Sequence, residues 1–260
     1  MATDKVIWIT GASSGLGREL ALEAGKNGNT VVLLARNVEK LHALQQIIEG
    51  QGAKAFAVFL DMSDTNMIAQ VTEQIVRKVG KVDVLINNAG FGVFEKVEQA
   101  NMQNVQEMFA VNVVGLIALT NSVLPHMLEQ NKGHIINIAS QAGKLSTPKS
   151  SVYAATKHAV LGFTNGLRME MIDTNIHISA VNPGPIRTPF FDRADKEGTY
   201  VKNIERWMLD SQDVAKATIK LIDHPKRELN LPRWMNAGST LYQLMPSLFE
   251  RLAGRKLNRK

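Results

Sequence analysis

Short runs of apolar and β-branched residues alternate with longer segments of helical pattern along the whole chain. Strands that are apolar on both faces are typical of a parallel sheet covered by two layers of helices. Strands are expected at residues 6–10, 30–35, 53–59, 82–87, 134–139, 176–181 and 228–231, and helices near 15–27, 38–51, 63–79, 103–129, 150–173 and 211–223. The alternation predicts an α/β fold, a single Rossmann-type doubly wound parallel sheet of about seven strands in which residues 1–260 form one domain.

Composition and charge narrow the class of protein. The chain has no cysteine, which excludes disulfides, thiolate nucleophiles and cysteine-ligated metals, and its histidines show no metal-ligand spacing. The net charge is +6, but residues 251–260 carry five basic residues and no acid, so the rest is nearly neutral. A nucleic-acid-binding face is therefore not expected. No signal pattern opens the chain, and the apolar stretch 109–119 falls short of a membrane span of about 20 residues, so a cytoplasmic protein is expected.

A glycine-rich segment follows the first predicted strand directly. Three glycines let the chain turn tightly and bring backbone N–H groups against a phosphate, and the following helix N-terminus adds positive partial charge. The segment reads Thr10-Gly11-Ala12-Ser13-Ser14-Gly15-Leu16-Gly17. A turn without a ligand is the alternative, but the strand before it and the helix after it favour a dinucleotide.

The end of the second strand bears on the choice of dinucleotide. NAD sites usually place a carboxylate there, whereas this chain has Leu34-Ala35-Arg36-Asn37. A guanidinium can hold a 2′-phosphate through paired N–H donors, so Arg36 predicts NADP(H), with Ser13 or Ser14 as helpers. The alternative is an arginine that is merely solvated at a strand end.

Three polar residues predict acid/base chemistry on a carbonyl. Tyr153 and Lys157 stand four residues apart in a helical pattern, so both point into one site. The ammonium is expected to lower the pKa of the phenol, as a general acid/base near neutral pH requires. Ser140 ends the fifth predicted strand and can hydrogen-bond a substrate carbonyl oxygen.

In this order and spacing, the motifs resemble the short-chain dehydrogenase/reductase superfamily over residues 4–232. The matching pieces are Thr10–Gly17, Asp61, Asn87-Asn88-Ala89-Gly90, Val111-Asn112-Val113, Ser140, Tyr153 with Lys157, Pro183-Gly184 and Ile186-Arg187-Thr188. The type is the NADP-preferring one with a Ser-Tyr-Lys-Asn tetrad.

The resemblance implies a role for each matching residue. Tyr153 would exchange a proton with the substrate oxygen that Ser140 orients, Lys157 would bind the nicotinamide ribose, and Asn112 would hold a water of a proton relay. For Asn112 a purely structural role is the alternative. The cofactor would be contacted by Asp61 and Met62 at the adenine, by Asn88, Ala89 and Gly90 along its length, and by Pro183, Gly184, Ile186 and Thr188 near the carboxamide.

The family places the substrate between the Ser140 loop and a flexible substrate loop at residues 188–210. The residues expected to line this pocket are Ser140, Gln141, Leu145, Tyr153, Phe190 and Phe191, with Phe91, Phe94, Trp207 and Met208 available nearby. This apolar lining predicts a ketone or secondary alcohol on a hydrophobic body. For each aromatic residue, a place in the core is the alternative.

The basic, amphipathic C-terminal extension at residues 236–260 departs from the acyl-carrier-protein reductases and resembles the hydroxysteroid-dehydrogenase-like and related bacterial branches. Apolar residues recur at helical spacing at Leu241, Leu244, Met245, Leu248, Phe249 and Leu252, and Pro246 predicts a kink or a helix start. Three interpretations remain open: a lid or subunit contact over the site, a helix that covers the core, and a peripheral membrane contact.

Together these features predict an NADP(H)-dependent enzyme that interconverts a ketone and a secondary alcohol by hydride transfer, with Tyr153 as general acid/base. The alternatives are a catalytically silent NADP(H)-binding or redox-sensing protein and, among enzymes, a 3-oxoacyl thioester reductase. A small-molecule substrate and a homo-oligomer, either dimer or tetramer, are the expected partners.

Overall fold

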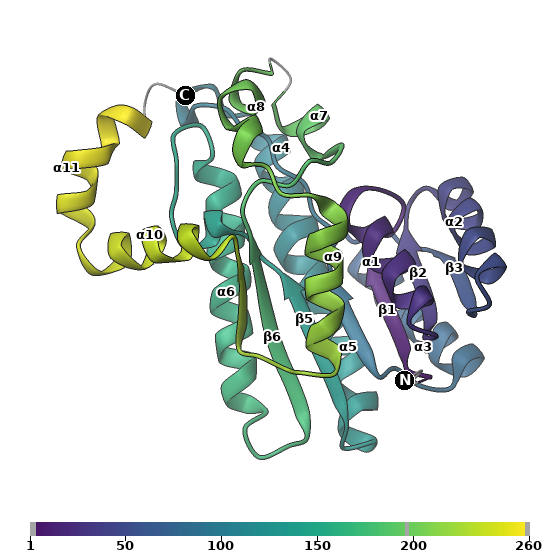
Figure 1. Cartoon of the computed structure of the whole chain (residues 1–260). Coiled ribbons are helices and arrows are strands. Elements are labelled where there is room, and N and C mark those ends of the chain that lie inside the picture. Colours follow the sequence, from purple (N-terminus) through teal and green to yellow (C-terminus); the bar gives the residue numbers. More distant parts are fainter. Residues whose placement is uncertain (1–3, 196–197, 258–260) are drawn as a thin grey trace.

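Seven parallel strands form one sheet in the order β3-β2-β1-β4-β5-β6-β7 (Figure 1). This computed structural model describes residues 4–195 and 198–257, with the backbone alone at Thr199 and residues 252–257. The strands are β1 Val6–Thr10, β2 Thr30–Ala35, β3 Ala55–Phe59, β4 Val84–Asn87, β5 Gly133–Ile138, β6 Ile176–Pro183 and β7 Glu228–Leu231. The predicted doubly wound sheet is confirmed.

Helices bury both faces of this sheet. The helices on one face are α1 Gly15–Lys26, α2 Val38–Gly50 and α9 Ser211–Ile219, and those on the other are α3 Thr65–Val79, α5 Leu116–Glu129 and α6 Ser151–Glu170. Successive side chains of a strand point to opposite faces, so Ile7 and Ile9 of β1 join the first apolar cluster and Trp8 the second. The central strands β1, β2 and β4 are almost wholly apolar and buried, because each lies between two such layers.

The order of the strands places the site. The chain builds the sheet outward from β1 to β3 and then returns to β4 on the other side of β1. In open sheets of this kind, ligands bind at the carboxyl ends of the strands where the order reverses. The loops that follow β1, β4, β5 and β6 meet at this edge and carry the chemistry described below.

The helix expected at residues 103–129 is present as one continuous element. The helix α4 Met102–Phe109, a π-helical turn at Ala110–Gly115 and α5 follow one another without a break from Met102 to Glu129, and an 18-residue window of this helix has a mean hydropathy of 1.7. By length and composition alone, this helix could cross a membrane, as no other in the described part of the chain could. The expectation that the stretch is too short was therefore wrong, because the π turn accommodates Asn112 and Gly115 without ending the helix. Its buried side chains pack on the sheet.

The segment 188–210, expected as a flexible loop, is largely helical where it is described. It contains α7 Phe190–Ala194, α8 Thr199–Ile204 and a 3₁₀ turn at Glu205–Trp207. Buried side chains of α7 and α8 form an apolar cluster of their own, which explains why this part folds into helices instead of an irregular loop.

Two helices, α10 Arg233–Leu244 and α11 Pro246–Leu257, form what we call the C-terminal arm, which stands out from the body beside α6 (Figure 1). The predicted helix start at Pro246 is confirmed. Much of the apolar stripe is exposed, at Leu241, Leu244, Met245 and Leu248, while the side chain of Leu252 lies outside the description. The interpretation of this segment as a core-covering helix was therefore wrong, because the bend between the helices turns the stripe away from the sheet.

Candidate active site

The glycine-rich loop after β1 forms a close backbone cradle. Gly11 has a φ of +67°, and a Cβ there would lie 3.0 Å from the Cα of Ala89. A Cβ at Gly17 would collide with the carbonyl oxygen of Gly11. Both positions require glycine, which leaves backbone N–H groups accessible at the N-terminus of α1. This cradle fits the diphosphate of a dinucleotide.

The loop after β4 is fastened to this cradle by hydrogen bonds. The Thr10 hydroxyl accepts from the backbone N–H groups of Asn88 and Ala89, both at 2.9 Å, and the Asn88 amide donates to the Thr10 carbonyl at 2.9 Å. The side chain of Asn88 therefore braces the two loops against each other while its residue lines the cavity.

At the adenine end, Arg36 and Asp61 lie at the ends of neighbouring strands. Their charged groups are 4.0 Å apart, and the Arg36 side chain is 66% exposed, so the guanidinium is free to turn toward a ligand. Burial raises the pKa of Asp61, but hydrogen bonds from the backbone and hydroxyl of Ser63, together with the Arg36 charge, outweigh it and lower that pKa overall. Ser14 makes no side-chain hydrogen bond to the helix that it precedes.

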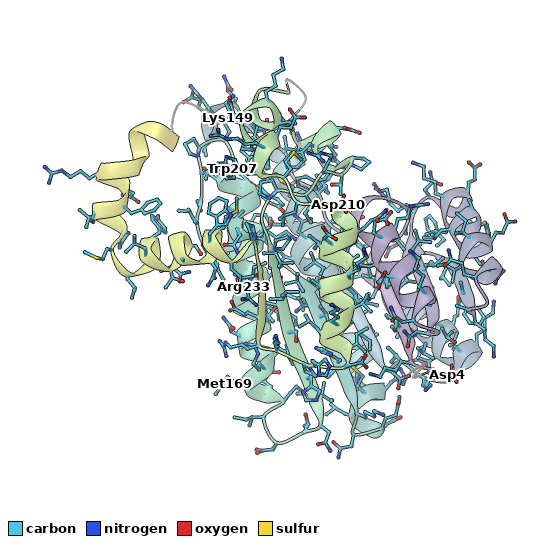
Figure 2. All side chains as sticks on the ribbon, viewed as in Figure 1. Asp4, Lys149, Met169, Trp207, Asp210 and Arg233 are labelled. Carbon is cyan, nitrogen blue, oxygen red and sulfur yellow. The ribbon has the colours of Figure 1, made fainter. Side chains whose placement is uncertain are left out.

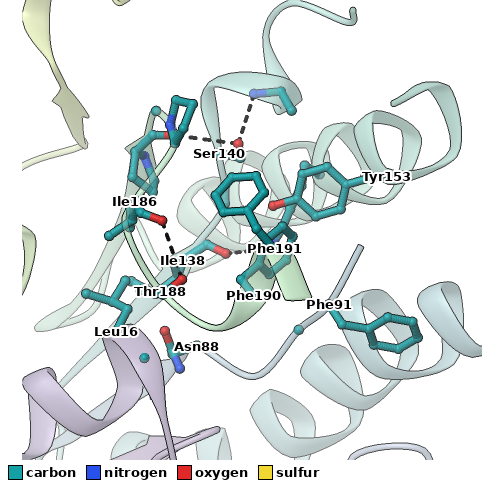
Figure 3. A pocket seen from close by; sticks show the side chains of 18 of the residues that line it. Leu16, Asn88, Phe91, Ile138, Ser140, Tyr153, Ile186, Thr188, Phe190 and Phe191 are labelled. Atoms are coloured by element: carbon teal, nitrogen blue, oxygen red, sulfur yellow. Dashed lines mark hydrogen bonds between the residues drawn. The ribbon is translucent and has the colours of Figure 1, made fainter. Parts of the chain in front are cut away.

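One cavity of about 970 Å³ joins this end to the predicted catalytic residues. Figure 3 shows its part around Ser140 and Tyr153. All the residues predicted to contact the cofactor or the substrate line this cavity, and Asn112 is the one predicted site residue that does not. The cofactor set is Gly11, Ser13, Ser14, Gly15, Leu16, Gly17, Arg36, Asp61, Met62, Asn88, Ala89, Gly90, Tyr153, Lys157, Pro183, Gly184, Ile186 and Thr188, and the substrate set adds Ser140, Gln141, Leu145, Phe190 and Phe191.

Tyr153 and Ser140 face each other across the inner part of this cavity. The Ser140 hydroxyl accepts from the Ala142 backbone N–H at 3.0 Å, which orients it, and it hydrogen-bonds the phenol of Tyr153. Burial raises the pKa of Tyr153 above its ordinary value of 10, and the Ser140 hydrogen bond offsets only part of this rise. The expectation that Lys157 holds this pKa low was therefore wrong for the protein without ligands, because desolvation of the phenolate dominates.

Lys157 is buried directly behind Tyr153. Its ammonium donates to the Ile138 carbonyl at 2.9 Å and lies 5.8 Å from the centre of the Tyr153 ring. Burial lowers the pKa of Lys157 from 10.5 to about 8. The group is thus charged near neutral pH and poised to lose its proton in mildly alkaline solution.

Asn112 supports the site from behind the lining. Its amide accepts from the Phe91 backbone N–H at 3.0 Å and donates to the Phe91 carbonyl at 2.8 Å and to the Thr156 hydroxyl at 3.1 Å. A Cβ at Gly90 would lie 3.0 Å from the Asn112 oxygen and 3.7 Å from the Lys157 nitrogen, so Asn112 and Lys157 flank the same glycine. Asn112 therefore positions the loop after β4, which is the structural role that the sequence left open as the alternative for this residue.

Aromatic rings form the wall opposite Ser140. Phe94 makes edge-on contacts with Tyr153 at 5.8 Å and with Tyr200 at 5.0 Å between ring centres. Phe190 packs against Tyr153 at 5.5 Å. Met208, named as available for the pocket, packs instead against the cluster of α7 and α8. The part of the cavity between these rings and Ser140, which we call the inner chamber, is therefore apolar on one side and polar at Ser140 and Tyr153.

Sequence reasoning missed a polar network under the catalytic loop. Lys144 forms an ion pair with Glu228 of β7 and donates to Asn230 at 3.0 Å, and Asn182 of β6 donates to Asn230 at 2.9 Å. Gln141, expected to face the substrate, donates its amide to the Asn182 carbonyl at 2.9 Å. No local pattern marks these residues, because the network joins β6, β7 and the loop after β5, which are far apart in the chain.

Comparison with known proteins agrees with this geometry. The family model described as short chain dehydrogenase matches residues 5–198. The chain is 36% identical over 200 residues to the Mus musculus protein named dehydrogenase/reductase SDR family member 7, which covers 75% of this chain but only 59% of the mouse protein, so the chain spans about three fifths of that relative. It is 37% identical over 224 residues to the NADP-dependent 3-hydroxy acid dehydrogenase of Schizosaccharomyces pombe, covering 83% and 85% of the two chains.

A solved structure gives the same result for the fold. The short chain dehydrogenase/reductase of Burkholderia phymatum in complex with NAD superposes with a TM-score of 0.87 at 27% identity, covering 95% of this chain and 96% of that one. With a family model matched over well more than half of its length and a yeast relative above 30% identity, the chain belongs to the short-chain dehydrogenase/reductase family.

Proposed function

We propose that the protein is an NADP(H)-dependent oxidoreductase that interconverts a ketone and a secondary alcohol carried on an apolar body. The observation that carries this proposal is the single cavity that joins the glycine cradle to Ser140 and Tyr153. When bound at the cradle, the nicotinamide nucleotide supplies or accepts the hydride. The chain itself binds and orients the nucleotide and the substrate, and it supplies the proton.

The raised pKa of Tyr153 keeps the phenol protonated at neutral pH, so a proton is available for the oxygen of a ketone, but its release depends on groups that stabilise the phenolate left behind. Ser140 stands within hydrogen-bonding reach of that phenol and can donate to the same substrate oxygen. The Lys157 ammonium, fixed by the Ile138 carbonyl, places a positive charge behind the ring. The charge that develops on the substrate oxygen and on the phenolate is therefore met by groups already in place.

Arg36 supports NADP(H) over NAD(H). A solvent-facing guanidinium at the end of β2 can form charge-assisted hydrogen bonds with a 2′-phosphate, and β2 ends without the carboxylate typical of NAD sites. The yeast relative is named NADP-dependent, whereas the Burkholderia structure contains NAD, so both nucleotides occur among similar proteins.

The inner chamber favours a neutral substrate over a small acid. Arg193, which lines it, forms an ion pair with Glu107 at 2.8 Å and stacks on the Phe91 ring at 3.6 Å. Glu107 already offsets the charge of this guanidinium, so Arg193 offers a substrate carboxylate little attraction. A 3-oxoacyl thioester carries no such charge there and belongs in the same substrate panel as simple ketones.

The proposal is tested by NADPH oxidation with a panel of ketones, beside a Tyr153→Phe variant. Wild type should reduce apolar ketones, and the variant should lose about 10²- to 10⁴-fold in kcat while binding NADPH with similar affinity. Turnover that survives in Tyr153→Phe would overturn the acid/base assignment. NADPH binding without turnover of any ketone or thioester would support the silent binding protein instead.

We also infer a homo-oligomer. Exposed apolar side chains occur on the long helix and on and just after α6, at Val114, Ile117, Leu128, Met169 and Ile172, and contacts between copies would cover them. Sedimentation equilibrium should give a dimer or tetramer, and a monomer at micromolar concentration would refute this inference.

A further inference from the structure

The cavity does not end at the aromatic wall of the inner chamber. Its lining continues over the 3₁₀ turn at Glu205–Trp207 and onto the C-terminal arm. The lining residues contributed there include Arg206, Trp207, Trp234, Met235, Ser239 and Phe249. Pockets for single ligands span about 300–1,000 Å³, and this cavity of about 970 Å³ lies at the top of that range. A substrate held at Tyr153 can therefore extend toward the arm without leaving the cavity.

The chemistry of this outer part is apolar and aromatic. Trp207 and Trp234 meet edge to face with 5.4 Å between ring centres, although they belong to different elements. Figure 2 labels Trp207 and Arg233, the residue that directly precedes Trp234. The two residues are 46% and 55% exposed. Arg206 lies over the Trp207 ring at 4.8 Å and extends the stack. Large rings left half in solvent at the mouth of a cavity gain stability when an apolar ligand covers them.

Hydrogen bonds join the C-terminal arm to the catalytic loop, the segment after β5 that carries Ser140, Gln141 and Lys144. Ser239 donates its hydroxyl to the side-chain oxygen of Gln141 at 3.3 Å, and Gln141 directly follows Ser140. Lys144 of the same loop donates to the side-chain oxygen of Asn236 at 3.0 Å. Both contacts come from the first two turns of α10, so the distance between the indole pair and the reacting carbonyl is fixed.

We propose that Trp207, Trp234, Met235 and Phe249 form an outer subsite that binds the far end of an elongated apolar ketone. This inference rests on the proposed ketone reductase function and names its substrate class. The inner chamber takes the carbonyl and its short substituent, and the outer subsite takes the apolar body. The occupant is the substrate because the outer subsite is continuous with the catalytic chamber.

The test is a homologous series of methyl ketones from 2-pentanone to 2-dodecanone, reduced by wild type and by Trp207→Ala and Trp234→Ala. In wild type, kcat/KM should rise about twofold to fourfold per methylene as the chain enters the outer subsite and then level off. Each variant should flatten the rise, so that the loss in kcat/KM relative to wild type grows with the length of the ketone and is smallest for 2-pentanone. Leu244→Ala is the matched control, because this leucine lies on the same arm, is 75% exposed and does not line the cavity.

A binding readout separates this inference from the proposed function. The chain has three tryptophans, and the third, Trp8, is fully buried in the core. Adding 2-dodecanone to the NADP⁺-loaded protein should therefore shift tryptophan emission to shorter wavelength through Trp207 and Trp234. A double Trp207→Phe, Trp234→Phe variant should lose this shift.

Three outcomes overturn the inference. Short ketones that turn over without any length dependence leave the reductase function standing and remove the outer subsite. A length dependence that survives both tryptophan variants, together with a changed sedimentation coefficient or lost binding to lipid vesicles, assigns the indoles to another copy or to a membrane. If no ketone turns over, the proposed function fails, and an unchanged emission spectrum with 2-dodecanone then rejects the subsite as well.

Discussion

Replacing Arg36 by alanine should reduce the preference for NADPH over NADH. The guanidinium is 66% exposed and lies 4.0 Å from Asp61, so no tight ion pair has to break before it binds a phosphate. A hydrogen bond to a charged group contributes about 1.5–3 kcal/mol, and solvent screening at this exposure favours the lower end. We therefore expect the ratio of kcat/KM for NADPH to that for NADH to fall about tenfold, with kcat/KM for NADH nearly unchanged.

The assay measures kcat/KM for both nucleotides at low salt and at about 1 M salt, where screening should shrink the difference between wild type and variant. Arg18→Ala is the matched control, because Arg18 stands on α1 near the cradle but pairs with Glu19 at 2.8 Å and does not line the cavity. Arg36→Asp should move the preference further toward NADH. An unchanged ratio in Arg36→Ala, or an equal fall in Arg18→Ala, would refute the reasoning.

Two further predictions follow from the same structure. Gly17→Ala should abolish NADPH binding or lower the free energy of unfolding by more than about 2 kcal/mol, because the new Cβ meets the Gly11 carbonyl. Gly166 of α6 has open space around it, so Gly166→Ala should be neutral or raise the free energy of unfolding by up to about 1 kcal/mol. Urea titrations and NADPH binding check this pair, and tolerance of alanine at Gly17 would contradict it. The pKa of Lys157 is about 8 in the folded protein and 10.5 in the unfolded chain. Between these pH values the unfolded chain binds more protons, so the contribution of Lys157 to the free energy of unfolding rises from pH 8 to pH 10.5. Lys157→Met should remove a rise on the order of 3 kcal/mol, and a difference between the two proteins that does not vary over this window would disprove the shift.

The polar network under the catalytic loop explains why the arm and the site are linked. Lys144 and Glu228 are both largely buried, and the amides of Asn230 and Asn182 satisfy them. Removing one partner of a buried ion pair strongly destabilises a protein, because the other charge is then buried without a partner. This network therefore holds the loop after β5 in place. Because Lys144 also reaches Asn236 of α10, the same side chain fixes the arm.

Local patterns in the chain were enough to predict the sheet, the glycine cradle and the pairing of Tyr153 with Lys157. Each of these depends on local periodicity: apolar runs make strands with two covered faces, and a spacing of four residues puts two side chains on one side of a helix. The roles of Gly11 and Gly17 in the cradle could be predicted from the sequence, because only glycine fits such a turn before a helix. These signals lie within a few residues, so no knowledge of packing was needed.

The pKa values of the catalytic groups and the extent of the cavity depend on contacts between segments that are far apart in the chain. The pKa directions of Tyr153 and Lys157 follow from burial by distant segments, and desolvation of the phenol outweighs the nearby ammonium that the spacing alone suggested. The hydrogen bonds of Asn112 depend on how the long helix packs against the loop after β4. The meeting of Trp207 with Trp234 follows in the same way from the path of the chain after β7, because contacts between remote segments are set by packing and leave no repeat in the sequence.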